Sequence, residues 1–533
     1  MYHMLYLILL LPFLLGIACA FCKEENARRL TPILAAAQTM LTALVIYAAV
    51  SGRDWATSVV YLSESLTFSL KMDGVAAVFA VVTAVCWLLT IPYAAVYMPH
   101  SGGEPRFYVF LFTTEAVLLG TALAADMVTL YLFYELTTLC SAPLVLHELK
   151  KKAIVGAYKY LFYSVGGAFV ALFGVVVLYF HCESLSFTAG GTMTEATPLT
   201  LAAVFCMILG FGAKAGLFPL HNWLPSAHPA APAPASALLS GLIAKAGVIA
   251  VLRTIFFTAG AGLLRGTWVQ TVCLILVLIS IFMGSFMGCL EKELKKRLAY
   301  SSISQISYVL LGLFILSPDG FTGSMLQLFF HAAAKIAIFQ CAGSIILLAH
   351  KTRVDELRGL GRRMPVTFIC FALVSLSLVG IPPFGGFHSK WYLATAALEA
   401  LPGALGYLVP VTLILSALFT AGYLFPPVIS AFFPGHDTEG LDLSPIREPA
   451  GIVVPLVIFC FTAQFTASAK YAPEGTSPKP FPFPAGAFAV PEVVPEAEPD
   501  EAVPPCPPAG REVEVLSVPA CAWASSVPAE VRV

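Results

Sequence analysis

Charged side chains are scarce in this chain. Asp, Glu, Lys and Arg make up 11% of its 533 residues, whereas soluble domains carry about 25%. Positive and negative residues nearly cancel, with a formal net charge of -1, so there is no electrostatic reason to expect nucleic acid as a partner. Hydrophobic residues account for 58% of the chain. This composition predicts a protein embedded in a lipid bilayer.

The sequence also lacks the motifs of redox cofactors and metals. One CxxC occurs, Cys19 to Cys22, without the second pair that a zinc site or an iron–sulfur cluster needs. There is no GxGxxG and no haem signature. Most other cysteines stand singly in apolar runs and are predicted to be small core hydrophobes. We therefore expect no cofactor, no metal and no catalytic site in this chain.

Long apolar runs are what the sequence does contain. A membrane-spanning helix takes about 20 mostly apolar residues, because its backbone satisfies its own hydrogen bonds. Such runs predict an all-α integral membrane protein with about fourteen transmembrane helices. The first run has no basic start and is long for a signal-peptide core, which predicts a span. The predicted spans are residues 2–22, 30–50, 73–98, 106–124, 126–147, 153–180, 199–219, 235–257, 268–290, 296–316, 323–349, 365–397, 403–432 and 449–468.

Basic residues gather in some of the loops between these runs. Short cytoplasmic loops are enriched in Lys and Arg, and with fourteen alternating spans the basic loops all fall on one side. This predicts a multi-pass protein of the inner (cytoplasmic) membrane with both termini outside the cytoplasm. Arg253 and Arg265 are the exception, since they fall on the opposite side. The basic loops are 23–29, 148–152, 291–297 and 350–363.

Two predicted spans should not continue as regular helices. Pro219 and Pro225 interrupt the seventh span, and Pro382 and Pro383 interrupt the twelfth, because proline removes an amide donor. A matching pair of interruptions points to a transport fold with internal repeats. The two spans are five helices apart, and an odd number inverts the second copy. The alternative is a pair of ordinary proline kinks.

The predicted organisation follows from these breaks. Helices 1–3 (1–105) precede a first inverted repeat of helices 4–8 (106–257) and a second of helices 9–13 (268–432). A final helix (449–468) follows. In the tail (470–533), 14 of the last 63 residues are proline, a density that predicts a disordered segment.

Five ionisable residues lie well inside predicted spans, at Glu135, Lys214, Lys245, Lys335 and Lys390. Each buried charge costs about 3 kcal/mol, so each needs a partner or water. By helical rise, the first four share one depth, and an ion pair between Glu135 and Lys214 is open. Because burial and a nearby carboxylate shift a lysine pKa in opposite directions, such a row predicts a proton pathway.

Several further residues are candidates for this pathway. His331 lies one helical turn from Lys335 and could relay protons with it, or it could be a satisfied core histidine. His221 and His228, near the first break, could admit protons or merely cap backbone. Glu115 also lies mid-span, and no partner or role can be assigned to it from the sequence.

These motifs resemble the antiporter-like subunits shared by respiratory complex I, membrane-bound hydrogenases and the Mrp cation/proton antiporters. The likeness covers residues 70–430 or so. It implies a fourteen-helix fold with two inverted five-helix repeats and a polar axis of Glu and Lys at mid-membrane. The motifs that carry it are "KAGLFPLHNWLPSAHPAAPAPASALLSGLIAKAGVIAVLR", "KELKKRLAYSSISQISYVLLG", "HAAAKIAIFQCAGSI" and "SLVGIPPFGGFHSKW".

The resemblance also assigns roles, carried over motif by motif. Glu135 and Lys214 resemble the ion pair of the first half, and Lys245 resembles its central relay. His331 and Lys335 resemble the continuation of that relay, and Lys390 resembles the group nearest the outer exit. A lysine in that last position disfavours the complex I subunit type that has Glu there. "HAAAK", "AHPAAPAP" and "GRRMP" are most similar to the Mrp D-type subunit or its hydrogenase relatives.

Three functions are consistent with the sequence. The leading one is a proton-translocating subunit of an energy-converting redox complex, either a complex I-like NADH:quinone oxidoreductase or a membrane-bound hydrogenase. Its expected partners are other membrane subunits, which carry the redox chemistry. The second is the D-type subunit of an Mrp-type Na+/H+ antiporter, with Na+ as well as protons carried. The third is a scaffold whose buried charges only fix helix packing.

Overall fold

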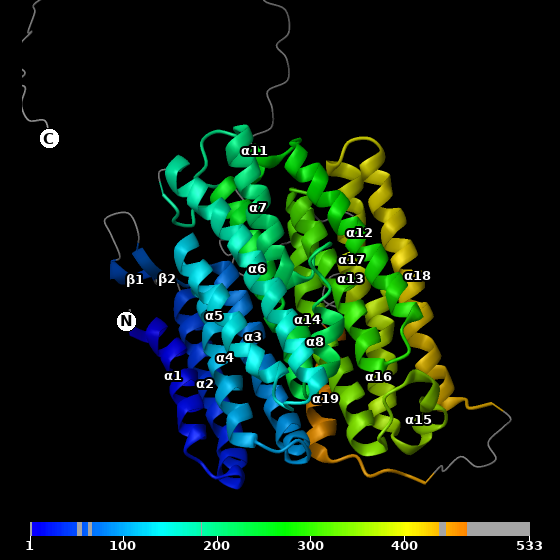
Figure 1. The fold of residues 1–533 in the computed structure, drawn as a ribbon. Helices are drawn as coiled ribbons and strands as arrows, with labels where there is room; N and C mark the ends of the chain where they lie inside the picture. The colour runs from blue at the N-terminus through cyan, green and yellow to red at the C-terminus, as the bar shows by residue number, and fades with distance from the viewer. Residues whose placement is uncertain (1–2, 51–55, 62–66, 183, 436–443, 466–533) are drawn as a thin grey trace, which may run out of the picture. The chain divides into compact units, whose positions relative to one another are not determined.

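The computed structural model describes residues 3–50, 56–61, 67–182, 184–435 and 444–465. Nearly all regular structure in these residues is helical (Figure 1). Helical residues occur within each predicted range, and some ranges, such as 235–257 and 365–397, are divided among several helices. The proline-rich tail (470–533) lies outside the described residues, so its predicted disorder stays a prediction.

The described helices form a multi-pass membrane protein. Ten of them are long and apolar enough to cross a membrane, and three shorter ones are also apolar. The main helices are α1 (His3–Ala20), α2 (Glu24–Val50), α3 (Gly74–Tyr97), α4 (Glu104–Leu123), α5 (Met127–Val145), α6 (Lys151–His181), α7 (Pro198–Ala215), α8 (Leu224–Ala230), α9 (Ala233–Leu238), α10 (Lys245–Arg253), α11 (Ala261–Leu264), α12 (Trp268–Leu290), α13 (Leu294–Phe314), α14 (Pro318–Ala349), α15 (Leu360–Arg363), α16 (Pro365–Val379), α17 (Gly385–Ala400), α18 (Ala404–Phe432) and α19 (Ala450–Phe465).

Side-chain caps fix where several of these helices begin. Asp73 accepts a hydrogen bond from the amide of Ala76 at the start of α3, and Asp126 does the same for Thr129 at the start of α5. Ser317 caps α14 in this way. Such caps satisfy backbone donors that have no partner inside the helix.

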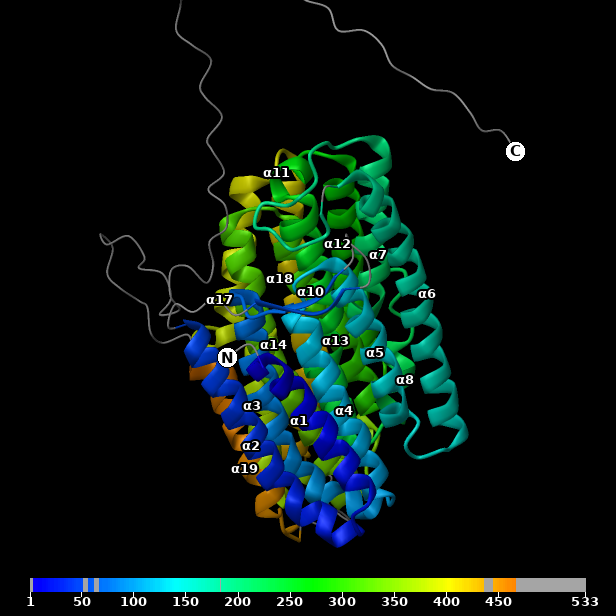
Figure 2. The ribbon, with the colours of Figure 1, turned by 90° about the vertical axis from the view of Figure 1, so that its left-hand side faces the viewer.

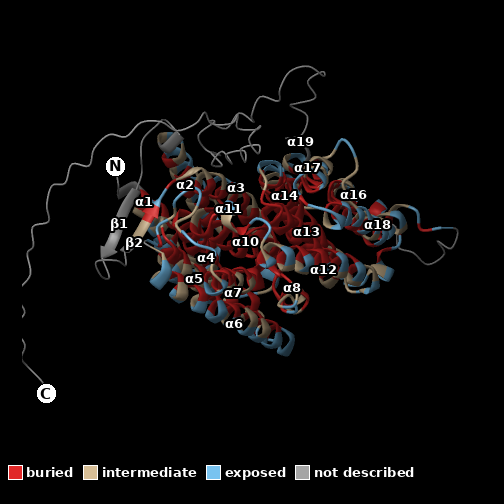
Figure 3. Cartoon of the chain, turned by 90° about the horizontal axis from the view of Figure 1, so that it is seen from above, coloured by how far each residue is buried: buried red, intermediate tan, exposed pale blue. Residues whose placement is uncertain are grey.

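Burial separates the inner helices from the outer ones. Seen from above, α10, α13 and α14 are almost wholly buried, whereas α6 and α18 carry exposed faces at the rim (Figure 3). Large apolar side chains such as Phe162 on α6 and Leu418 on α18 are more than 60% exposed. Apolar side chains on outer faces are expected where lipid rather than water is the solvent.

A β-hairpin that was not predicted from the sequence lies between α2 and α3 in the chain. Strands β1 (Ala56–Tyr61) and β2 (Thr67–Lys71) pair antiparallel. β2 also reaches the turn between α4 and α5, where the amide of Ala125 donates to Ser69 O at 3.0 Å. The hairpin lies beside α5 at one end of the neighbouring helices (Figure 2).

Both predicted interruptions coincide with helix ends. α7 ends at Gly216, in the left-handed region with φ 82°, and α16 ends at Gly380 with φ 89°. In each case a cis peptide bond precedes the third residue after the glycine, Pro219 or Pro383. α8 then follows the first break and α17 the second. Both interrupted segments thus begin at a left-handed glycine that ends one helix and continue into another helix.

The eighth predicted span is irregular as well. After α9 the chain forms a π-helical turn, η2 (Leu239–Ile243), before α10 begins, and a second π-helical turn, η3 (Thr254–Ala259), follows α10. π-Helical turns leave carbonyl groups out of register with the usual i to i+4 bonding and are frequent at functional sites. This span therefore offers free acceptors inside the protein.

Candidate functional site: a buried row of lysines

Four lysines lie in the interior of the helical bundle. Lys214, Lys245 and Lys335 are wholly buried, and Lys390 is 9% exposed. All four ammonium groups donate hydrogen bonds to main-chain carbonyl oxygens. Carbonyl acceptors compensate for part of the hydration that a buried cation loses.

Lys214 lies in the last turn of α7 and is held by Tyr134 of α5. Its Nζ donates to Tyr134 O at 2.5 Å and lies 3.6 Å from the centre of the Tyr134 ring, a cation–π contact. Glu135 is the next residue. Its carboxylate interacts electrostatically with Lys214, but no nitrogen–oxygen distance between them falls within 4 Å, and Glu135 Oε1 has no hydrogen-bond partner. The two form a charge pair without direct contact.

Lys245 is held by the π-helical turn that precedes it. Its Nζ donates to the carbonyls of Ser240, at 3.2 Å, and Gly241. The Ser240 hydroxyl is hydrogen-bonded to the Ser302 hydroxyl of α13 at 2.7 Å. The irregular turn therefore stabilises the ammonium group of Lys245 and also contacts the neighbouring helix α13 through Ser240.

His331 and Lys335 share one face of α14, one turn apart. Lys335 Nζ donates to Ser301 Oγ at 2.7 Å and to Leu298 O at 3.2 Å. His331 is 1% exposed, and neither of its ring nitrogens has a partner. It lies within electrostatic range of both Lys245 and Lys335. The structure thus brings Lys245, His331 and Lys335 together.

A short chain of polar groups connects Lys245 with Lys335. Ser302 Oγ, already bonded to Ser240, also donates to Leu298 O at 2.9 Å, the carbonyl that accepts from Lys335. Ser240, Ser301 and Ser302 were not among the residues predicted from the sequence. The signal for Ser301 and Ser302 is the run "AYSSISQISY", which places several hydroxyls on a helix that is otherwise buried among apolar neighbours.

Lys390 lies just after the second break. Its Nζ donates to Leu378 O at 2.6 Å and Val379 O at 2.8 Å, the last carbonyls of α16. Gln305 of α13 donates to the same Leu378 oxygen at 3.1 Å. The ammonium also lies 5.1 Å from the Tyr308 ring centre. The carbonyl groups freed by the end of α16 are therefore what holds this lysine.

A hydroxyl cluster adjoins Lys390 through Tyr308. Ser416 Oγ lies 2.5 Å from Tyr308 Oη and 2.5 Å from Ser285 Oγ. Ser304 Oγ lies 2.7 Å from Ser285 Oγ. The cluster joins α12, α13 and α18, and two of its members, Ser304 and Tyr308, belong to the run "AYSSISQISY".

The remaining candidates lie apart from direct partners. Glu115 of α4 is 1% exposed, and its Oε2 has no hydrogen-bond partner. His221 lies in the first break and stacks on Phe218, with ring centres 5.7 Å apart. His228 of α8 is wholly buried, stacks on Phe339 of α14 at 4.9 Å, and has no partner on either nitrogen. The His228 ring therefore caps no backbone group.

Both arginines that did not fit the charge pattern, Arg253 and Arg265, have hydrogen-bond partners. Arg253 is wholly buried and donates to both oxygens of Asp73, at 2.5 and 2.9 Å. Its guanidinium also lies beside the Phe187 and Phe257 rings, 5.0 and 4.6 Å from their centres. Arg265 donates to Leu316 O at 2.7 Å. Arg253 therefore belongs to a buried ion pair and not to a loop.

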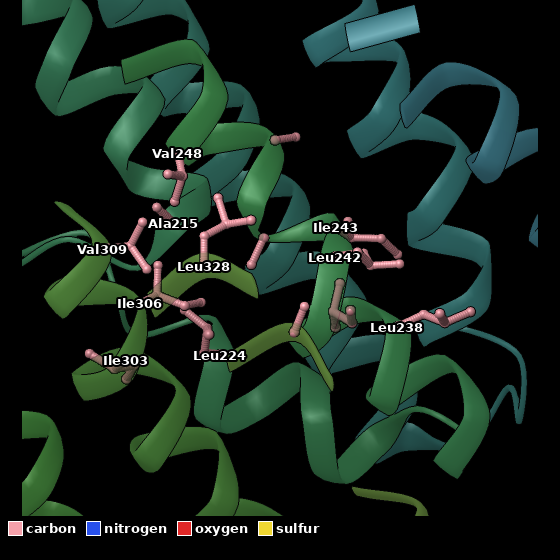
Figure 4. Close-up of a cluster of buried hydrophobic side chains, with 14 of the residues drawn as sticks. Ala215, Leu224, Leu238, Leu242, Ile243, Val248, Ile303, Ile306, Val309 and Leu328 are labelled. Atoms are coloured by element: carbon pink, nitrogen blue, oxygen red, sulfur yellow. The ribbon is translucent and has the colours of Figure 1, made fainter. Parts of the chain in front are cut away.

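Buried apolar side chains fill the space between the interior helices. Figure 4 shows one such cluster, with Leu224 of α8, Leu242 and Ile243 of η2, Ile306 of α13 and Leu328 of α14. Such dry surroundings strengthen every electrostatic interaction among the buried groups.

The fold and the site together define a class. A multi-pass helical protein with two interrupted helices and several buried ammonium groups belongs among ion-transporting membrane proteins, where intramembrane charges mark ion or proton routes.

Comparisons with known proteins agree with this class. Residues 124–420 match the family described as NADH:quinone oxidoreductase/Mrp antiporter, TM. NADH-quinone oxidoreductase subunit N of Desulforudis audaxviator is 30% identical over 80% of this chain and 87% of its own length. Na+/H+ antiporter subunit A1 of Staphylococcus haemolyticus is 31% identical over 70% of this chain, but only 49% of its own length is matched. The chain belongs to the NADH:quinone oxidoreductase/Mrp antiporter family of transmembrane proteins.

Solved structures share the fold. The Mrp complex of Dietzia sp. contains a chain with a TM-score of 0.74 at 20% identity, covering 87% of this chain and 94% of that one. Respiratory complex I of Thermus thermophilus contains one with a TM-score of 0.73 at 22% identity, covering 87% and 95%. The predicted resemblance to the antiporter-like subunits is thereby confirmed.

Proposed function

We propose that this chain translocates protons as an antiporter-like membrane subunit of an energy-converting redox complex. The observation that carries the proposal is the set of four buried lysines, with His331 within electrostatic range of two of them, Lys245 and Lys335. The four are Lys214, Lys245, Lys335 and Lys390. Four buried cations would cost about 12 kcal/mol if left alone. A role in packing alone explains neither that repeated cost nor the unpartnered imidazole of His331.

The proposed route runs along the membrane plane through these groups. Lys214 and Glu135 form its first pair, Lys245, His331 and Lys335 its centre, and Lys390 the end nearest the outer surface. A proton can pass when a neighbouring charge changes, because each ammonium group donates its hydrogen bonds to uncharged oxygens and so responds strongly to nearby charge. His221 and His228 are the proposed groups for uptake from the cytoplasmic side.

The architecture proposed for this function has fourteen crossings and two inverted five-helix repeats. In support, both breaks begin where a helix ends at a glycine in the left-handed region, Gly216 or Gly380, and both continue into a further helix. The chain would lie in the cytoplasmic membrane with its basic loops inside and both termini outside. It would bind no cofactor or metal of its own, and its partners would be the other membrane subunits of the complex.

A second function, Na+/H+ exchange as an Mrp-type subunit, has a specific observation in its favour. The Staphylococcus haemolyticus relative at 31% identity is named as a subunit of such an antiporter. The two functions differ in their driver. Transport that starts with an electron donor favours the redox complex, whereas transport that starts with a sodium pulse favours the antiporter.

The test is substitution of the central lysines in the assembled complex. Lys245→Ala and Lys335→Ala should abolish proton translocation in membrane vesicles while the chain still assembles, because the route loses a carrier. Lys151→Ala, an exposed lysine of α6, is the control and should transport normally. Normal pumping in either central variant would favour the scaffold function and refute the proposal.

A further inference from the structure

One lysine of the basic loops is not on the surface. Residues 291–297 were predicted as a loop, yet Lys295 is the second residue of α13 and is only 6% exposed. Its Nζ donates to Ala231 O at 2.9 Å, the carbonyl just after the end of α8. Its neighbour Lys296 instead points outward, with its side chain 38% exposed, and pairs with Glu291 at 2.6 Å.

Two partly exposed carboxylates lie near Lys295. Glu148 and Glu293 are within electrostatic range of its ammonium group, and their side chains are 30% and 32% exposed. Glu293 also pairs with Lys152 at 2.7 Å. Half-exposed carboxylates beside a buried lysine are suited to collect protons from solvent and pass them inward.

On the inner side, Lys295 adjoins His228. Ser236 Oγ donates to both His228 O, at 2.8 Å, and Ala231 O, at 3.2 Å, so one hydroxyl ties the His228 segment to the carbonyl that Lys295 holds. The His228 ring lies within electrostatic range of Lys295 and of Lys335. It stacks on Phe339, which is four residues along α14 from Lys335.

His228 has the features of a relay and not of a packing residue. It is wholly buried, and neither ring nitrogen has a hydrogen-bond partner. A neutral imidazole has one donor and one acceptor nitrogen, and leaving both unpaired in the interior costs free energy. A proton or a water molecule passing between the two lysines would satisfy both.

We propose that Lys295 is the inner gate for proton uptake, receiving protons from the Glu148 and Glu293 carboxylates and passing them through His228 to Lys335. The proton on Lys295 Nζ goes to an imidazole nitrogen, the opposite nitrogen releases one toward Lys335, and the neutral amine regains a proton from the carboxylates. The inference rests on the proposed proton-translocating function. It adds a residue at the junction of the two halves and a direct way into the centre of the row.

Three substitutions at Lys295 test the gate in vesicles that contain the complete complex. Lys295→Met removes the titratable group and should lower proton translocation about 100-fold. Lys295→Arg keeps the charge and the hydrogen bond to Ala231 O, but it should also block transport, because arginine does not release its proton. Lys295→His restores a titratable donor and should recover a large part of the rate. Lys296→Met is the matched control and should leave the rate unchanged.

The outcomes separate the gate from the function it rests on. Normal transport in Lys295→Met, or in Lys295→Arg, would overturn the gate, the latter by showing that only charge is needed. Failure of Lys295→His to recover transport would assign Lys295 a structural role and overturn it too. Lys245→Ala and Lys335→Ala are measured alongside. If these two abolish transport while Lys295→Met does not, only the gate fails; if all are normal, the proposed function fails as well.

Discussion

The ion pair between Arg253 and Asp73 leads to a quantitative prediction. Arg253 is wholly buried, whereas the Asp73 side chain is 24% exposed. Removing one partner of a buried pair costs about 3–5 kcal/mol, because it leaves an uncompensated charge. Partial exposure of Asp73 and the two aromatic rings beside the guanidinium offset some of this loss. We expect Asp73→Asn to lower the free energy of unfolding by about 3 kcal/mol.

Asparagine isolates the charge from the other role of Asp73. Asp73 also caps α3 through the Ala76 amide, and asparagine caps a helix about as well as aspartate. The loss therefore reports the ion pair. The double substitution Arg253→Met with Asp73→Asn removes both charges and should recover about half of the loss, since no uncompensated charge is then left in the interior.

The assay is unfolding of the purified chain in mixed micelles, followed by circular dichroism. The control is Glu25→Gln, which removes a carboxylate from the exposed pair with Arg29, whose side chains are 71% and 75% exposed. Exposed pairs contribute about 0–1 kcal/mol, so this variant should unfold almost as the native chain does. A loss below about 1 kcal/mol for Asp73→Asn, or no recovery in the double variant, would refute the reasoning.

Two further predictions concern a lysine contact and a titrating histidine. A Cβ on Gly380 would lie 2.9 Å from Lys390 Cδ, so Gly380→Ala should displace the ammonium and lower proton translocation several-fold in vesicles. Gly403→Ala, at a similar positive φ with open space around it, should not, and equal effects would contradict a role for the contact. Burial lowers the pKa of His147, beyond the end of α5, so stability should fall as pH drops below about 6.5, where the unfolded chain takes up a proton that the folded chain resists. His147→Gln should flatten that dependence, measured as the thermal unfolding midpoint at several pH values; an unchanged slope would exclude His147 as its source.

Much of the fold was predictable from local patterns. Apolar runs located the helices, because the length that spans lipid is fixed by helical rise. Prolines located both helix ends at the breaks, because proline cannot continue the backbone ladder. The lysines of the row stood out as charges inside apolar runs, a signal that needs no knowledge of neighbours.

What was missed depends on contacts between distant segments. Arg253 and Asp73 are 180 residues apart in the chain, so the sequence around either residue does not indicate that the two form an ion pair. The sequence left an ion pair between Glu135 and Lys214 open, and in the structure the Lys214 ammonium group donates to Tyr134 O instead. Lys295 lies in a basic run like any exposed loop, and only the position of the α8 end shows that it is buried. Depth inside a bundle is a property of packing, and periodicity does not report it.

The carbonyl acceptors of the lysines have a consequence for mutagenesis. Lys245 is held by the main-chain oxygens of Ser240 and Gly241. Lys390 is held by those of Leu378 and Val379. Every amino acid supplies such an oxygen. A scan that replaces one side chain at a time leaves these carbonyl oxygens in place, so it would not report what binds the cations. Replacing a backbone amide by an ester weakens the carbonyl as an acceptor. Such a replacement would therefore test how much each carbonyl contributes to binding the lysine.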